Sequence, residues 1–424
     1  MRFTVTTTAP ARSLLAPAPT CAAPPVPDPA APVQWRPLAA IGVLGAALVT
    51  YVGLAHGARQ AVLLALGVGL GVALFHSRFG FTSAWRQLVA VGNGAGLRAH
   101  AVLLGTTATL FALIIGTGTG LFGSQPAPSA GPIGVGLVLG AFLFGVGMQL
   151  GGACASGTLF AVGSGQSTIV LTLFGFIAGS VLYTWGYPLV ADLPALPAFV
   201  LSEHIGWFGS WAVTIAVLLA VVAVSRVVQA RRNPPPTGVP PTARGVARIL
   251  RGAWPMWVGA LVLAALGGAV LVVSGGAWGI TSAFALWGAK ALQAVGLHPE
   301  TWAYWQQPAQ AKSLAGPVLV DKTSLTDIGI MIGAALAATA GGAWVMHRSI
   351  PWRTALAAVL GGIIMGIGAR LASGCNIGAY LAGIASGSLS GWIWAVAALA
   401  GTWVGLRGRA LFGLANPKPS DSVC

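Results

Sequence analysis

Two cysteines lie in similar motifs, one in each half of the chain, and both motifs could bind an anion. Cys154 belongs to LGGACASG at 150–157, and Cys375 belongs to LASGCNIG at 371–378. Each motif follows a long apolar stretch, and its small residues are expected to interrupt the helix there. The short helix after each cysteine would present free amides and a partial positive charge, which attract anions and favour a thiolate. We therefore predict that both cysteines line a path for an anion.

The neighbours of these cysteines provide the backbone freedom and the polar groups that such a path needs. Glycines permit close approach and positive φ, whereas hydroxyl and amide side chains can hydrogen-bond to a solute. The candidate residues of this kind are Gly152, Gly374, Ser156, Asn376 and Gln149. Arg370, five residues before Cys375, could draw anions inward or could extend its charge to the membrane surface.

A second motif also occurs twice, as FGFTSAW at 79–85 and WGITSAF at 278–284. Its paired hydroxyls could donate hydrogen bonds to a polar solute, or they could form bonds between helices. These residues are Thr82, Ser83, Thr281 and Ser282.

Several other chemistries compete for the two cysteines. A buried cysteine can be an inert small apolar residue, and the pair could instead form the redox couple of a membrane thiol oxidoreductase. A metal site is not expected, because no His, Asp or Glu lies at ligand spacing from either cysteine. No cofactor is expected either, and Cys21 and Cys424 in the chain ends receive no role.

The sequence offers no evident energy source for transport. It has no Walker A motif and no chain of acidic residues that would relay protons. Asp327 is interpreted as a helix N-cap, and His56, His76 and His100 as residues at the membrane surface.

The composition assigns these motifs to a membrane protein. Of 424 residues, 56% are hydrophobic and 7% are charged, whereas soluble domains carry about 25% charged residues. The net charge of +15 does not indicate a nucleic-acid binder, because the basic residues lie between apolar stretches. We expect an all-α polytopic protein whose surroundings are the lipid bilayer.

About ten stretches are long enough to cross a bilayer, which takes about 20 residues. They are predicted at 38–56, 60–76, 100–123, 131–150, 166–185, 209–229, 253–275, 325–346, 352–372 and 390–412. Three shorter, interrupted pieces near 79–95, 278–296 and 376–388 are predicted to be re-entrant.

Basic loop residues orient these spans with the N-terminus in the cytoplasm. The predicted organisation is a disordered cytoplasmic tail (1–37, without the apolar core of a signal peptide), a first transmembrane half (38–229), a basic cytoplasmic linker (230–252) and a second half (253–424). The segment 290–324, with three lysines on the predicted outer side, is the exception to the charge rule.

The two copies of the repeated motifs start five spans apart, so they face opposite ways across the membrane. Inverted repeats whose broken segments meet near the midplane are the usual construction of a transport path. A passive channel for small neutral solutes is the remaining alternative from the residues alone.

The quoted cysteine motifs, together with AWGITSAFALWG at 277–288 and GLHPETWAY at 296–304, resemble the YeeE/YedE family of bacterial sulfur-compound transporters, in particular its YedE branch. The resemblance covers most of 60–412. It implies an inner-membrane importer of thiosulfate or a related sulfur-containing anion, with an hourglass-shaped path in which Cys154 and Cys375 are the relay thiols. It also implies a TusA-like cytoplasmic sulfur-carrier protein as partner.

The chain departs from the family pattern at Gly80 and Gly279, where family thiosulfate importers carry a cysteine. With fewer thiols along the path, a selenium compound or another sulfur species becomes an alternative substrate.

Overall fold

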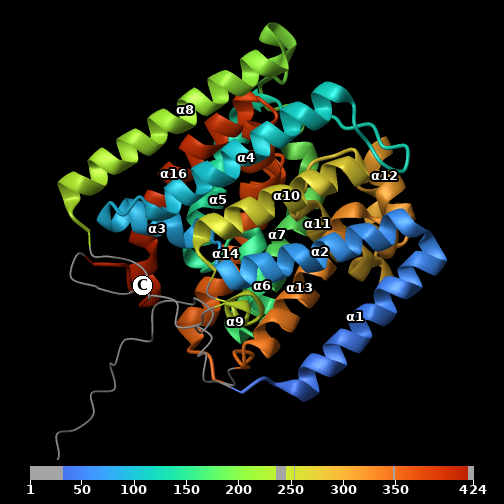
Figure 1. Cartoon of the computed structure of the whole chain (residues 1–424). Helices are drawn as coiled ribbons and strands as arrows, with labels where there is room; N and C mark the ends of the chain where they lie inside the picture. The colour runs from blue at the N-terminus through green and yellow to red at the C-terminus, as the bar shows by residue number, and fades with distance from the viewer. Residues whose placement is uncertain (1–31, 235–244, 253, 347–348, 419–424) are drawn as a thin grey trace, which may run out of the picture.

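The structure is a computed structural model that describes residues 32–234, 245–252, 254–346 and 349–418. It is almost entirely helical, and ten of its segments are long and apolar enough to cross a membrane (Figure 1). The helices of these segments are α1 (Trp35–His56), α2 (Ala58–Ser77), α4 (Ala95–Thr117), α5 (Val135–Leu150), α7 (Ser167–Trp185), α8 (Ser202–Arg232), α10 (Met256–Ser274), α13 (Lys322–Ala340), α14 (Trp352–Leu371) and α16 (Leu389–Gly408). The predicted all-α polytopic class is confirmed.

Shorter elements connect these helices. They are α3 (Phe81–Val91), α6 (Ala155–Gly163), α9 (Val246–Arg251), α11 (Thr281–Ala294), α12 (Pro308–Ala315), α15 (Ala382–Ala385), the π-helix η4 (Asn376–Leu381), the 3₁₀ turns η1 (Tyr187–Leu189), η2 (Pro299–Thr301), η3 (Val318–Val320) and η5 (Arg409–Phe412), and the strands β1 (Ile133–Gly134) and β2 (Ala195–Leu196). The strands pair antiparallel, with Ile133 opposite Leu196. The three pieces predicted to be re-entrant correspond to α3, α11 and the run η4–α15.

Local sequence explains where the short helices begin and end. Gly80 precedes α3, and Gly92 ends it in the left-handed conformation at φ 76°. Asp321 caps α13, because its carboxylate accepts a hydrogen bond of 2.7 Å from the Ser324 amide. The interpretation of Asp327 as the N-cap was therefore wrong, since Asp327 lies one and a half turns further into the helix.

Two boundaries of the predicted organisation differ in the structure. Helix α1 begins at Trp35, inside the predicted tail, and α8 continues through Arg232, inside the predicted linker. That linker also contains the short helix α9. The histidine prediction was wrong for His76 and His100, whose side chains are buried.

The helices pack in pairs that follow the internal repeat. The contact between α2 and α13 has its equivalent between α10 and α4, and the contact of α7 with α14 has its equivalent between α16 and α5. The short helices obey the same rule, since α6 packs on α13 and α15 packs on α4. The two copies are thus related by a pseudo-two-fold axis, across which α5 meets α14 and α2 meets α10.

Small residues permit the close approach of these pairs. A Cβ added to Gly71 of α2 would collide with the backbone of Ile330 in α13, and one added to Gly329 would collide with the backbone of α2. Gly140 of α5 lies in the same way against Gly368 of α14. Helices α1 and α8 lie on opposite outer edges of the bundle (Figure 1) and bury little of their surface.

Candidate functional site

Cys154 is held at the end of a broken hairpin between α5 and α6. Gly152 adopts φ 84°, which turns the chain after α5, and Cys154 is then the N-cap of α6. Its side chain is 1% exposed, and its sulfur lies 3.5 Å from the Ser156 hydroxyl. The hydroxyl of Thr158 donates to the Cys154 carbonyl at 2.8 Å, which fixes the first turn of α6. The thiol thus lies at a helix N-terminus in the protein interior.

Cys375 occupies the equivalent place between α14 and η4. Its side chain is also 1% exposed, and the backbone N–H groups of Ile377 and Gly378 hydrogen-bond to its sulfur. It interacts electrostatically with Cys154, so the two motifs approach each other in the interior. Both cysteines belong to the main apolar core and carry free thiols.

The two breaks use different residues for the same turn. Gly152 aligns with Ser373 in the second motif, and Ser373 is the left-handed residue there, at φ 57°. Gly374 follows at φ 154°, where a Cβ would press on Ala379. Ser373 makes the same turn as Gly152, but its backbone is strained because a residue with a side chain rarely adopts a positive φ.

Asn376 carries the most unusual polar group of the site. It is 1% exposed, and neither its amide oxygen nor its amide nitrogen has a hydrogen-bond partner. An unpaired buried amide is costly, and this one directly follows Cys375 in the chain.

Gln149 organises the polar groups on the α5 side. Its side-chain oxygen accepts from Arg86 Nε at 3.0 Å, and its amide nitrogen donates to the Thr82 carbonyl at 3.4 Å. Arg409 Nη1 donates to the Gln149 carbonyl at 2.7 Å. All four residues are buried. Gln149, which directly precedes the Cys154 motif, therefore accepts hydrogen bonds from two buried arginines.

Arg370, which is equivalent to Gln149, makes the corresponding contact in the second copy. Its Nη2 donates to the Thr281 hydroxyl at 2.9 Å, and its Nη1 donates to the Tyr304 hydroxyl at 3.3 Å. The guanidinium is thus directed toward the second repeated motif. The structure joins the predicted residues in equivalent pairs, Gln149 with Thr82 and Arg370 with Thr281.

The two predicted serines lie apart from these pairs. Ser83 is exposed and donates to the Gly80 carbonyl of its own turn at 3.2 Å. Ser282 is also exposed and donates to the Thr323 hydroxyl at 2.9 Å, which links α11 to α13. Only the Ser282 hydrogen bond joins two helices, whereas that of Ser83 stays within its own turn.

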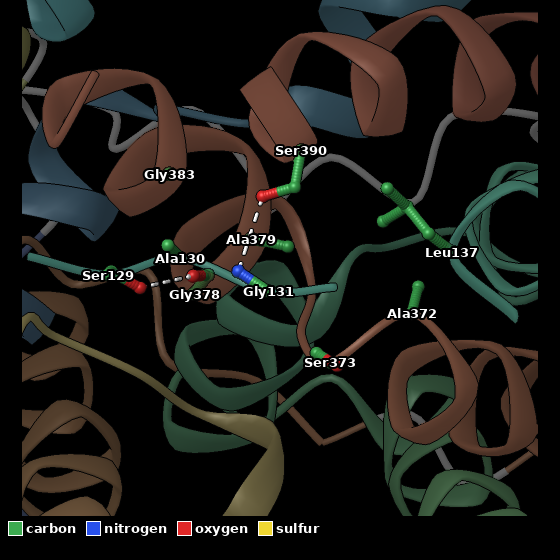
Figure 2. A pocket seen from close by; sticks show the side chains of 10 residues that line it. All are labelled: Ser129, Ala130, Gly131, Leu137, Ala372, Ser373, Gly378, Ala379, Gly383 and Ser390. Atoms are coloured by element: carbon green, nitrogen blue, oxygen red, sulfur yellow. Dashed lines mark hydrogen bonds between the residues drawn. The ribbon is translucent and has the colours of Figure 1, made fainter. Parts of the chain in front are cut away.

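A small pocket of about 40 Å³ lies against the turn that carries Cys375 (Figure 2). Its volume suits about two or three waters. Ser129 donates to the Gly378 carbonyl, and the Gly131 amide donates to the Ser390 hydroxyl, each at 3.4 Å. The lining residues are Ser129, Ala130, Gly131, Leu137, Ala372, Ser373, Gly378, Ala379, Gly383 and Ser390. The pocket brings hydroxyl groups to the backbone of η4.

The inserted segment between α11 and α13 supplies Tyr304 to this region. Trp305 and Leu314 pack on α11 and hold the segment in place. At its start, hydrogen bonds from Gln293 and His298 lower the pKa of Glu300 to about 2, so this exposed carboxylate is ionised at neutral pH.

Sequence reasoning missed Arg86, Arg409 and Tyr304 as members of the site. It counted both arginines only as loop charges that orient the spans. The available signal for Arg86 was its position four residues after Thr82, on the same face of α3.

Among the described residues, no group of three or more His, Cys, Asp or Glu could hold a metal. Cys21 and Cys424 lie outside the described residues.

Comparison with known proteins identifies the family of the chain. The profile of the family described as Sulphur transport matches residues 76–404, which is most of the chain. The thiosulfate transporter TsuA of Spirochaeta thermophila is 28% identical over 373 residues, which cover 80% of this chain and 96% of that protein. TsuA of Escherichia coli (strain K12) is also 28% identical, over 80% of this chain and 92% of its own length.

A shorter but stronger match is found with the probable transporter YedE of Escherichia coli (strain K12). It is 37% identical over 136 residues, which are 32% of this chain. This match spans only 33% of the length of YedE.

Proposed function

This chain belongs to the Sulphur transport family, and from that premise we propose that it imports thiosulfate or a related sulfur-containing anion. The family and the ten apolar segments support the coarser statement, a membrane transporter of a sulfur compound. The names of the TsuA relatives, which match most of the chain, support thiosulfate as the substrate class.

One observation carries the proposal. Cys154 and Cys375 place two buried free thiols at equivalent helix breaks of the internal repeat. A soft, polarizable sulfur atom of the substrate can accept a weak S–H hydrogen bond from each thiol. Weak sites in series let an ion enter without trapping it, as conduction requires.

Groups around each thiol would bind the charged end of the anion. The amides of Ile377 and Gly378 already hydrogen-bond to the Cys375 sulfur, and the unpaired Asn376 amide lies beside them. Arg370 on one side of the path and Arg86 on the other add positive charge. Charge-assisted hydrogen bonds of this kind are stronger than neutral ones.

The charge distribution supports a bacterial inner-membrane location with a cytoplasmic N-terminus. In this orientation the Cys375 motif opens outward and the Cys154 motif opens to the cytoplasm. A TusA-like sulfur-carrier protein is the proposed acceptor on the cytoplasmic side, on the basis of the family resemblance. The protein itself is proposed to act as a transporter and not as an enzyme.

The test is growth of a cysteine-auxotrophic bacterium on thiosulfate as sulfur source. Cys154→Ala and Cys375→Ala should each abolish this growth at normal expression, because either change removes one thiol of the series. Cys21→Ala combined with Cys424→Ala is the matched control and should leave growth intact. Full growth with both single variants of the path cysteines would contradict the proposal.

Counterflow into liposomes defines the substrate. The purified protein should exchange labelled thiosulfate, and a panel of sulfite, sulfate, selenite and cysteine should compete less well. If the substrate is a selenium compound, selenite should compete with labelled thiosulfate more strongly than the other compounds of the panel do. If the protein were instead an oxidoreductase that works through a disulfide between Cys154 and Cys375, an excess of reductant would abolish its activity. Thiosulfate exchange should continue under the same conditions.

A further inference from the structure

Two buried titratable side chains, Asp327 and His100, have no part in the proposed path. Both are 0% exposed, and neither the carboxylate oxygens nor the ring nitrogens make a hydrogen bond. Ionisable groups at membrane depth are expensive and are retained for a function. Packing alone would favour an apolar residue at either position.

The two residues occupy equivalent places in the repeat. His100 is the sixth residue of α4 and Asp327 is the sixth residue of α13, and these helices are equivalent because each packs on the first helix of the other copy. In the predicted orientation α13 begins at the outer surface and α4 begins at the cytoplasmic surface. Asp327 therefore lies about one and a half turns below the outer surface, and His100 lies equally deep on the inner side.

Asp327 is coupled to the path through Cys375. The groups that interact with it electrostatically are Asp321, at the start of its own helix, and the Cys375 thiol. Other titratable groups on the helices packed against α13 are Arg59 and His76 on α2, Lys290 on α11, Arg248 and Arg251 on α9, Arg36, Tyr51 and His56 on α1, and Cys154 before α6. An anion at Cys375 would repel the ionised carboxylate and so favour its protonated form.

His100 lies beside the repeated motif that precedes α3. Its ring centroid is 4.4 Å from that of Phe81 and 5.3 Å from that of Phe79. The backbone of Gly80 lies near the His100 ring, but neither ring nitrogen has a hydrogen-bond partner. Of the helices packed against α4, α3 carries Arg86, α8 carries Glu203, His204, Arg226, Arg231 and Arg232, and α10 and α15 carry no charged residue.

We propose that Asp327 and His100 are the outer and inner proton-binding sites of this transporter, so that anion and proton move inward together. This inference rests on the proposed function. An anion imported alone would move against an inside-negative membrane potential, and each co-transported proton offsets one unit of its negative charge.

The proton balance is simple. The Asp327 carboxylate takes a proton from the outer solution and becomes a neutral carboxylic acid while the anion occupies the Cys375 motif. When the anion passes to the Cys154 motif, the same proton moves inward with it from the Asp327 carboxyl group to the neutral imidazole of His100. His100 then releases it to the cytoplasm and returns to its neutral form.

Proteoliposomes loaded at alkaline pH and diluted into acidic buffer test the coupling. A gradient of about two pH units should raise the accumulation of labelled thiosulfate by up to about a hundredfold per coupled proton, because equal concentration ratios carry equal free energy. A protonophore should remove the increase. Asp327→Asn and His100→Gln should each lose the response to the gradient but keep thiosulfate counterflow, which needs no net proton movement.

Matched controls separate titration from structure. His76→Gln changes another buried histidine, which takes no part in the proposed proton route, so it should keep the full response to the pH gradient. Asp327→Glu keeps a carboxylate and should restore the response that Asp327→Asn loses.

The outcomes distinguish the two proposals. Absence of thiosulfate counterflow by the unmodified protein would overturn the proposed function. Normal counterflow with no response to the pH gradient, or a response to a sodium gradient instead, would overturn the proton inference. A full gradient response in Asp327→Asn or in His100→Gln would overturn the role of that residue.

Discussion

At the scale of single residues, the site is distinguished by polar groups that the protein itself leaves unpaired. Asn376 is the clearest case, because its buried amide follows Cys375 and neither of its polar atoms has a partner. A polar group needed only for folding would be paired within the protein. Asn376 is therefore expected to contribute to substrate binding and not to stability.

Asn376→Leu should separate these two contributions. Removing an unpaired buried amide should raise the free energy of unfolding by about 1 kcal/mol. Losing a hydrogen bond to a charged solute should raise the KM for thiosulfate by about tenfold or more. The measurements are denaturant unfolding in detergent micelles and initial uptake rates in liposomes.

Asn416→Leu is the matched control, because the Asn416 amide donates to the Leu406 carbonyl at 2.7 Å. It should lower stability and leave KM unchanged. A drop in stability with unchanged KM for Asn376→Leu would assign Asn376 to the fold.

Residue patterns in the sequence predicted some of the site but not the partners of its members. The spacing of the repeated motifs made Cys154, Asn376 and Arg370 candidates, because a duplicated motif is visible without a structure. The same patterns did not indicate that Arg409, after the last membrane helix, returns to the Gln149 carbonyl. Burial of Asp327 was also hidden, since its position near the start of an apolar stretch is equally consistent with a helix cap.

At the scale of elements, the close helix pairs are set by glycines at spacings of four residues. The sequence located most helix ends within a few residues, because membrane spans have a strong apolar signal. It did not identify which helices pair across the repeat, since that depends on which small-residue faces meet. The pairing of α2 with α13 brings Gly67 and Gly71 against Thr326 and Ile330.

Gly71→Leu should therefore disrupt the protein more than an ordinary substitution in a membrane helix. A side chain at this position meets the backbone of α13, which cannot move aside as a flexible side chain would. We expect the free energy of unfolding to fall by on the order of 3 kcal/mol. Titration with SDS in mixed micelles measures the change.

Gly267→Ala in α10 is the control, because nothing lies within 4 Å of the added Cβ. It should be neutral or stabilising by about 0.5–1 kcal/mol. Equal effects of the two substitutions would show that α2 and α13 do not pack as closely as described.

At the scale of the whole molecule, the transport proposal depends on the opposite orientation of the two copies. The helix pairs establish a pseudo-two-fold relation between the copies, but the position of the membrane comes from the loop charges. Thr119, after α4, and Met346, after α13, are exposed residues in equivalent loops. An inverted repeat must place them on opposite faces of the bilayer, whereas a parallel repeat would place both on one face.

Thr119→Cys and Met346→Cys, each made in a Cys21→Ala and Cys424→Ala background, test this directly. A membrane-impermeant maleimide applied to intact cells should label Thr119→Cys and should label Met346→Cys only after lysis. The unmodified background defines the signal from the two buried path cysteines. Labelling of both variants in intact cells, or protection of both, would contradict the inverted arrangement. In that case the Cys154 and Cys375 motifs would open on the same side, and a path through both thiols could not cross the membrane.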